Sequence, residues 1–186
     1  MNRLMMKLTI GSEAIFFLCL IVAYLYFWRS GNFQKEVAEH LSIKSTGIFT
    51  AILLFSSFSF WKAEKNHSNE NYKATKLWLI ITILLGVIFL SGQGHEYYKL
   101  IQENVLISKS EFGSSFYTLT GFHGLHVFIG LIILLVVLAL TMQGYLLNKN
   151  SSVIRTVGIY WHFVDAVWIF VFTTIYVLPY ILWRSY

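Results

Sequence analysis

The chain has 186 residues, of which 56% are hydrophobic, 18% aromatic and only 12% charged. Soluble domains average about 25% charged residues, so this composition excludes an ordinary soluble domain. The net charge of +5 comes from basic residues near the ends of apolar segments, which membrane topology explains better than nucleic-acid binding does.

Five apolar segments are long enough to cross a bilayer core about 30 Å thick, which takes around 20 helical residues. We therefore predict an all-α, polytopic membrane protein, a single domain over residues 1–186 built as a bundle of five transmembrane helices. The predicted helices cover residues 10–28, 43–61, 77–98, 116–142 and 153–178. Short polar connections join them, at residues 30–42, 62–76, 99–115 and 144–152. The last helix is expected to stop near Pro179, the only proline, because proline cannot continue a helix without losing a hydrogen bond.

The first predicted helix carries one cysteine and one carboxyl. Cys19 is the only cysteine, so it can form neither a disulfide within the chain nor a cysteine metal site. The apolar run is too long for a signal peptide, and we expect a retained helix. Glu13 lies a few residues past the start, where a carboxyl in hydrocarbon needs a partner or a proton. Two interpretations stay open: the carboxyl reaches the interface, or it is buried with a functional or inter-subunit role.

The third predicted helix ends in Gly92-Gln93-Gly94-His95-Glu96-Tyr97-Tyr98. Gln93 and Glu96 share one helix face, as do Gln93 and Tyr97. Because this stretch lies at the expected interface, two interpretations stay open. The side chains form a solvated rim, or they form hydrogen bonds to neighbouring helices.

The fourth predicted helix holds Thr120-Gly121-Phe122-His123-Gly124-Leu125-His126-Val127. Gly121 and Gly124 lie three residues apart, where a missing Cβ lets another helix approach closely. His123 and His126 have the same spacing and should face other helices or a cavity, because lipid offers no hydrogen-bond partner. The histidines are interpreted as packed, hydrogen-bonded core residues; a polar relay and a metal or haem site are the alternatives.

The fifth predicted helix holds Tyr160-Trp161-His162-Phe163-Val164-Asp165-Ala166-Val167-Trp168. Trp161, Asp165 and Trp168 follow the i, i+4, i+7 spacing of one packing stripe. Asp165 lies deep in its helix, where an unpaired carboxylate is costly. We therefore predict a contact between Asp165 and a histidine, either His162 or the pair His123 and His126. A solitary protonated Asp165 is the alternative.

Basic residues near helix ends favour the cytoplasmic side, which gives an expected orientation. The side that holds the N-terminus carries eight of them: Arg3, Lys7, Lys62, Lys65, Lys73, Lys76, Lys149 and Arg155. The other side carries six: Arg29, Lys35, Lys44, Lys99, Lys109 and Arg184. We expect a cytoplasmic N-terminus and a C-terminus outside.

Together these segments resemble subunit III of the haem–copper terminal oxidases, in its short, five-helix bacterial form. The matching stretches are Ser12–Phe17, Gln93–Tyr97, Gly113–Phe116, Thr120–Val127 and Tyr160–Trp168. The last two are long, ordered and correctly spaced, and the resemblance covers the chain from about residue 8 to about residue 178.

The resemblance implies a non-catalytic subunit of a proton-pumping oxidase in a bacterial inner membrane, with no redox centre or metal of its own. Its main partner would be subunit I, which holds the haems and copper, beside subunit II and small subunits; bound phospholipid is also implied. Glu13 matches the family's carbodiimide-reactive glutamate, which implies a part in sustaining proton uptake and the catalytic lifetime of subunit I. Polar positions that hold the bundle together are matched by His123, His126, His162 and Asp165.

Two departures and several alternatives accompany the resemblance. Seven-helix members have two further N-terminal helices, which supply part of a lipid-holding cleft and have no counterpart among the five segments here. The end of the second segment, Trp61-Lys62-Ala63-Glu64, matches the longer relatives weakly. The short form also occurs in quinol oxidases and in an accessory protein of nitric oxide reductase. An integral b-type haem protein is disfavoured because His123 and His126 lie on one helix, and a transporter because no repeat or broken helix pair is visible.

Overall fold

The computed structural model describes residues 3–30, 41–146, 148 and 152–183, and within these residues all regular structure is helical. The long helices are α1 (Arg3–Ser30), α3 (Ile43–Ser68), α4 (Tyr72–Gln102), α5 (Glu111–Met142) and α6 (Ser152–Phe172). A π-helical turn, η1 (Thr173–Val177), leads from α6 into the short α7 (Leu178–Trp183). Each of the five spans is long and apolar enough to cross a membrane. The predicted all-α bundle of five membrane-spanning helices is confirmed.

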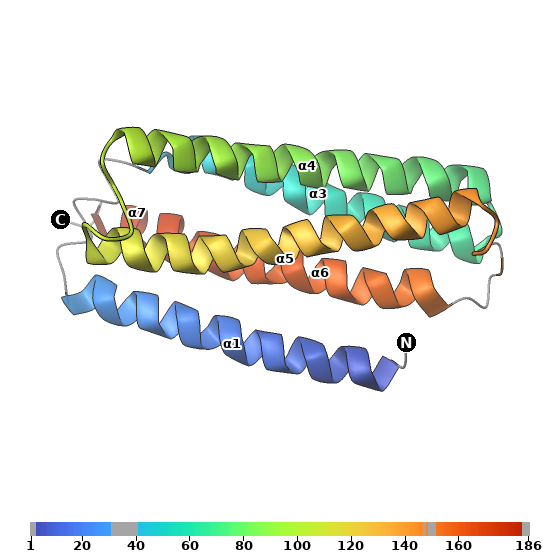
Figure 1. Cartoon of the computed structure of the whole chain (residues 1–186), viewed down its shortest axis with the longest axis horizontal. Coiled ribbons are helices and arrows are strands. Elements are labelled where there is room, and N and C mark those ends of the chain that lie inside the picture. The colour runs from blue at the N-terminus through green and yellow to red at the C-terminus, as the bar shows by residue number, and fades with distance from the viewer. Residues whose placement is uncertain (1–2, 31–40, 147, 149–151, 184–186) are drawn as a thin grey trace.

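The helices lie roughly side by side, with α1 at one edge of the bundle and the α3–α4 pair at the opposite edge (Figure 1). Between these edges, α5 contacts α4, α6 and α1, and α6 also contacts α3. The N-terminal ends of α3 and α5, the C-terminal end of α4 and α7 lie together at one end of the bundle, on the left in Figure 1. We call this the α7 end. The start of α1 lies at the other end.

The helices are longer than the sequence predicted, and two predicted connections are largely helical. The connection expected at 62–76 shrinks to Asn69, Glu70 and Asn71, and the one expected at 99–115 shrinks to residues 103–110. Polar residues beyond the hydrocarbon core extend the helices, and a side-chain cap marks where the next helix begins. Asn71 accepts from Ala74 N at 3.2 Å, and Ser110 accepts from Gly113 N at 2.9 Å. Residues 31–40, 147 and 149–151, in the other two predicted connections, lie outside the described residues.

The predicted stop at Pro179 is wrong, because the helical path continues past it. Leu178 N–H bonds to Thr173 O, five residues back, as in a π-helix. This widening directly precedes Pro179, whose nitrogen has no proton to donate. The π turn thereby lets the chain pass the proline and continue into α7.

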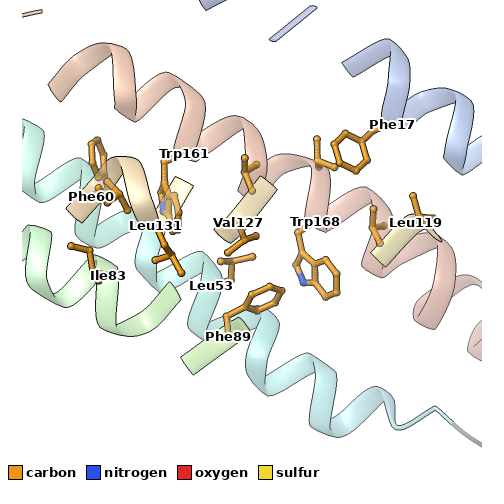
Figure 2. Close-up of a cluster of buried hydrophobic side chains, with 14 of the residues drawn as sticks. Phe17, Leu53, Phe60, Ile83, Phe89, Leu119, Val127, Leu131, Trp161 and Trp168 are labelled. Atoms are coloured by element: carbon orange, nitrogen blue, oxygen red, sulfur yellow. The ribbon is translucent and has the colours of Figure 1, made fainter. Parts of the chain in front are cut away.

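The bundle core is built around large aromatic side chains from several helices. Trp161 and Trp168 of α6 are 0% and 1% exposed, and their indole N–H groups donate to Ser56 Oγ at 3.2 Å and Thr50 Oγ1 at 2.9 Å on α3. Figure 2 shows Trp168 beside Phe89, and their ring centroids are 4.9 Å apart. These contacts fix the face of α6 that carries Trp161 and Trp168 against α3 and α4.

Trp161 fits only because two neighbouring helices present glycine to it. A Cβ on Gly86 of α4 would lie 3.1 Å from the Trp161 ring, and a Cβ on Gly130 of α5 would lie 2.9 Å from it. The missing side chains let three helices close around one indole. Glycine therefore serves close packing in this bundle, as is common where helices meet in membranes.

Candidate functional site

A carboxyl and an imidazole meet between α1 and α5. Glu13 Oε2 lies 3.1 Å from His126 Nε2, and His126 lies halfway along α5. Tyr160 of α6 donates its hydroxyl to the backbone oxygen of His126 at 3.1 Å, and the edge of Phe17 packs on the imidazole with ring centroids 5.0 Å apart. The pair therefore joins three helices near the middle of the membrane-spanning region.

The hydrogen bonds of His126 determine how many protons the pair holds. Nδ1 lies 2.7 Å from the backbone oxygen of Phe122, and a carbonyl oxygen can only accept, so Nδ1 carries a proton. The contact between Nε2 and Glu13 then requires one further proton, either on the carboxyl or on Nε2. In both arrangements the pair has no net charge and one proton lies between the two side chains. A proton can thus change its partner within the pair at constant charge.

The pair faces the side of the bundle rather than its centre. The Glu13 side chain is 33% exposed and that of His126 is 14% exposed. The neighbouring residues Ile15 and Leu18 on the outer face of α1 are 64% and 58% exposed. Glu13 is therefore open to whatever lies against α1 in the membrane.

A second polar cluster joins α4 to α5. Gln93 Nε2 donates to the backbone oxygen of Thr120 at 2.7 Å and to Tyr97 Oη at 3.2 Å. Tyr97 Oη and Thr120 Oγ1 are also hydrogen-bonded, at 2.7 Å. Gly124 makes room for this amide, because a Cβ there would lie 2.9 Å from Gln93 Oε1. Gly121 has no such role, since its Cβ would meet only Tyr97 Oη at an ordinary 3.6 Å.

We therefore expect alanine to have opposite effects on stability at Gly124 and at Gly121. Gly124→Ala should displace the Gln93 amide from its bonds and destabilise the bundle by about 1–3 kcal/mol. Gly121→Ala should be neutral or stabilising by up to about 1 kcal/mol, because alanine favours helix over glycine. Thermal unfolding of both variants in detergent compares them directly. Equal stability of the two variants would contradict the role assigned to Gly124.

Glu96 lies one turn beyond Gln93 on α4 but bonds to different elements. Its Oε1 accepts from Thr46 Oγ1 of α3 at 3.0 Å, and its Oε2 accepts from Tyr176 Oη of η1 at 2.8 Å. Gln93 and Glu96 thus both bond to neighbouring helices instead of forming only a solvated rim. Glu96 ties the π turn to the α3–α4 pair.

His123 is packed among aromatic rings. It is 0% exposed, and its ring centroid lies 4.7 Å from that of Trp168, 5.9 Å from that of Phe89 and 6.5 Å from that of Phe17. Neither ring nitrogen has a hydrogen-bond partner among the described residues. His123 is thus a packed core residue, but the predicted hydrogen bond is not found for it among the described residues.

The predicted contact between Asp165 and a histidine is wrong. Asp165 is 3% exposed, and neither carboxyl oxygen has a hydrogen-bond partner among the described residues. His162 instead turns to α3, where its Nδ1 is hydrogen-bonded to Ser57 Oγ. Ser57 also lies near the Asp165 carboxyl, although without hydrogen-bond geometry. The spacing of three on one helix did not bring the two side chains together because a hydroxyl on the neighbouring helix bonds the imidazole.

The sequence did not predict several of the hydrogen-bond partners in these clusters. They are residues with hydroxyl side chains on neighbouring helices: Thr46, Thr50, Ser56, Ser57, Thr120, Tyr160 and Tyr176. Serine, threonine and tyrosine are common in membrane helices, so no local pattern marks the ones that reach a partner many residues away. Only the intramembrane carboxyls, amide and imidazoles gave a signal, because they need such partners.

Known proteins are similar to this chain over most of its length. The family model for cytochrome c oxidase subunit III matches residues 2–180. A probable cytochrome c oxidase subunit 3 of Nocardia farcinica is 39% identical over 169 residues, which cover 90% of this chain and 83% of the relative. The cytochrome c oxidase subunit 3 of Corynebacterium diphtheriae is 36% identical over 174 residues, with coverages of 90% and 83%.

A third relative is named as a subunit of a ubiquinol oxidase. The cytochrome bo(3) ubiquinol oxidase subunit 3 of Buchnera aphidicola is 36% identical over 167 residues, which cover 89% of this chain and 87% of the relative. The resemblance inferred from the sequence motifs is confirmed by these matches. The chain belongs to the cytochrome c oxidase subunit III family.

Proposed function

We propose that this chain is a non-catalytic subunit III of a proton-pumping haem–copper terminal oxidase, where it sustains the stability and proton uptake of subunit I. Membership of the family makes it a multi-pass membrane subunit that assembles with other oxidase subunits. The observation that carries the more specific proposal is the Glu13–His126 pair. It holds one proton at constant charge near mid-membrane, on a face of the bundle that is open beside α1.

The proposed partners are subunit I first, then subunit II and the small subunits of the complex. Subunit I would hold the haems and copper, and this chain would hold no redox centre of its own. The aromatic packing of His123 and the engagement of His126 and His162 by hydrogen bonds support this assignment. The proposed location is a bacterial inner membrane, with the N-terminus cytoplasmic and the C-terminus outside, on the basis of the basic residues.

The experiment that tests this proposal is gentle detergent purification of the tagged chain, followed by identification of its partners. A haem- and copper-containing subunit I should co-purify, and the chain separated from it should show no haem absorbance. Haem absorbance that stays with the separated chain would contradict the proposal. Co-purification with a nitric oxide reductase in place of a copper-containing oxidase would contradict it as well.

A quinol oxidase subunit III is the second candidate function. It is favoured by the Buchnera relative, which is as similar to this chain as the Corynebacterium relative is. The electron donor binds elsewhere in such complexes, so the purified complex decides between the two. Oxidation of cytochrome c would identify the complex as a cytochrome c oxidase, and oxidation of a quinol would identify it as a quinol oxidase.

A further inference from the structure

Asp165 is a carboxyl enclosed in the middle of a membrane span, which runs from Ser152 to Ile181. It is 3% exposed, and neither of its oxygens has a hydrogen-bond partner among the described residues. An ionised aspartate at the centre of a membrane helix costs about 2.5–3.5 kcal/mol on insertion scales, and here no donor offsets that cost. We therefore expect Asp165 to hold a proton. Such a carboxyl can exchange its proton only with a group that lies beside it.

One hydroxyl lies between this carboxyl and a base. Ser57 of α3 is near the Asp165 carboxyl, and its Oγ is hydrogen-bonded to His162 Nδ1. The χ2 torsion of an aspartate is broad, so rotation of the carboxyl toward Ser57 costs little. A hydroxyl donates one proton and also accepts, so Ser57 can accept from Asp165 while it donates to His162. The three side chains thus provide a series of donors and acceptors that runs from α6 to α3 and back.

The series points toward the end of the bundle at which α1 begins (Figure 1). His162 is only partly buried, and Glu64 is the charged group that acts electrostatically on its imidazole. Glu64 lies about 10 Å further along the α3 axis than Ser57, at 1.5 Å per residue. Its Oε2 packs against α6 one turn before His162, where a Cβ added to Gly158 would lie 3.5 Å away. The Glu64 side chain is 30% exposed and lies 3.8 Å from Arg155 Nε, so it joins the buried groups to the surface.

We propose that the Asp165 carboxyl is a mid-membrane proton-binding site, which exchanges its proton with Glu64 at the surface. Ser57 and His162 relay the proton between these two carboxyls. In the outward step, Asp165 passes its proton to Ser57 Oγ, and the Ser57 proton passes to His162 Nδ1. His162 then releases its Nε2 proton to the Glu64 carboxylate. Asp165 becomes ionised, Glu64 becomes neutral, and the serine and imidazole end with the charge they had, so the transfer is balanced. The reverse step reloads Asp165.

A purely structural role explains the bond between Ser57 and His162 but not the carboxyl at position 165. An apolar side chain would fill the same volume without the cost of burying a polar group. The relay contains neither Glu13 nor His126, so it is separate from that pair and does not depend on the proposed function.

Infrared spectroscopy of the full chain, with the partner subunits it retains, tests the proposal on transfer from H2O to D2O. The C=O stretch of a protonated carboxyl shifts when deuterium replaces its proton, and the band that Asp165→Asn removes belongs to Asp165. Exchange of this band should slow roughly tenfold or more in Ser57→Ala, because a positioned proton-transfer group is lost. Ser56→Ala, the same substitution on the adjacent residue, should leave the rate unchanged, because Ser56 bonds Trp161 instead.

His162→Asn separates a relay from a structural hydrogen bond. The asparagine oxygen can accept from Ser57 in place of Nδ1, but the amide does not take up a proton, so exchange should slow as in Ser57→Ala. Glu64→Gln should slow exchange as well. If Asp165→Asn does not fold, Asp165→Glu assigns the band by moving it instead of removing it.

Three results would overturn the proposal. If no protonated-carboxyl band depends on position 165, Asp165 is ionised and stores no proton. An exchange rate in folded His162→Asn equal to that of the unmodified protein would leave the bond between Ser57 and His162 a structural one only. An unchanged rate in Glu64→Gln would exclude Glu64 as the group through which the proton reaches the surface.

Discussion

Trp161→Ala is expected to destabilise the bundle by about 3–5 kcal/mol, the range for truncation of a buried tryptophan to alanine. Trp161 is 0% exposed and fills the space that Gly86 and Gly130 leave between three helices. Neighbouring backbones already lie close to the indole, so they cannot close the cavity further without moving whole helices. Ser56 keeps its own bond to the backbone oxygen of Leu53, so the loss is one of packing.

Thermal unfolding in a mild detergent measures this effect, with Trp61→Ala as the matched control. Trp61 is 45% exposed, and Lys62 and Lys65 lie over its ring, so its truncation leaves no internal cavity. The control should lose at most about 1 kcal/mol, the usual strength of an exposed cation–π contact. A loss of stability in Trp61→Ala equal to that in Trp161→Ala would show that Trp161 does not organise the core.

Glu13→Ala is expected to change the assembled oxidase far more than it changes the fold. The variant should leave initial turnover largely intact, because no part of the oxygen-reducing centre is proposed to lie in this chain. It should speed inactivation or slow proton uptake, because His126 loses the carboxyl with which it holds a proton. The free energy of unfolding should fall by only about 1–3 kcal/mol, since the pair is partly exposed.

Turnover traces of the purified complex, recorded until activity is lost, measure both quantities in one experiment. Glu111→Gln is a suitable control, because it removes a carboxylate from an exposed site at the start of α5. Glu13→Gln separates the loss of charge from the loss of volume. If the catalytic lifetime and the rate of proton uptake both stay unchanged in Glu13→Ala, Glu13 has no functional role.

The number and type of the elements could be predicted because five apolar runs each exceed the thickness of a bilayer core. The ends could not be predicted from hydropathy. Residues 62–68 and 72–76 are largely polar yet helical: α3 continues to Ser68, and the side chain of Asn71 caps the start of α4 by accepting from Ala74 N. The helix end predicted at Pro179 was also wrong, because the π turn directly before the proline lets the helical path continue past it.

The candidate site could be predicted only in part. Glu13, Gln93 and Glu96 stood out because lipid cannot satisfy a carboxyl or an amide. Their partners His126, Thr120 and Tyr176 lie on other helices, at sequence separations that carry no signal in a single chain.

The Asp165 prediction shows the limit of reasoning from spacing. Residues three apart on a helix can pair, but here the His162 imidazole is hydrogen-bonded to Ser57 on another helix. The wrong prediction therefore arose from packing between α3 and α6, which only the three-dimensional structure supplies.

The most direct test of the account is a double-mutant cycle on the catalytic lifetime of the complex, using Glu13→Gln, His126→Asn and the two combined. If the carboxyl and the imidazole act as one proton-holding unit, each single variant should shorten the lifetime by the same factor as the double variant. If the effects of the two single variants multiply in the double variant, Glu13 and His126 act independently, which would contradict this claim. Lifetimes equal to that of the unmodified complex in all three variants would contradict it as well.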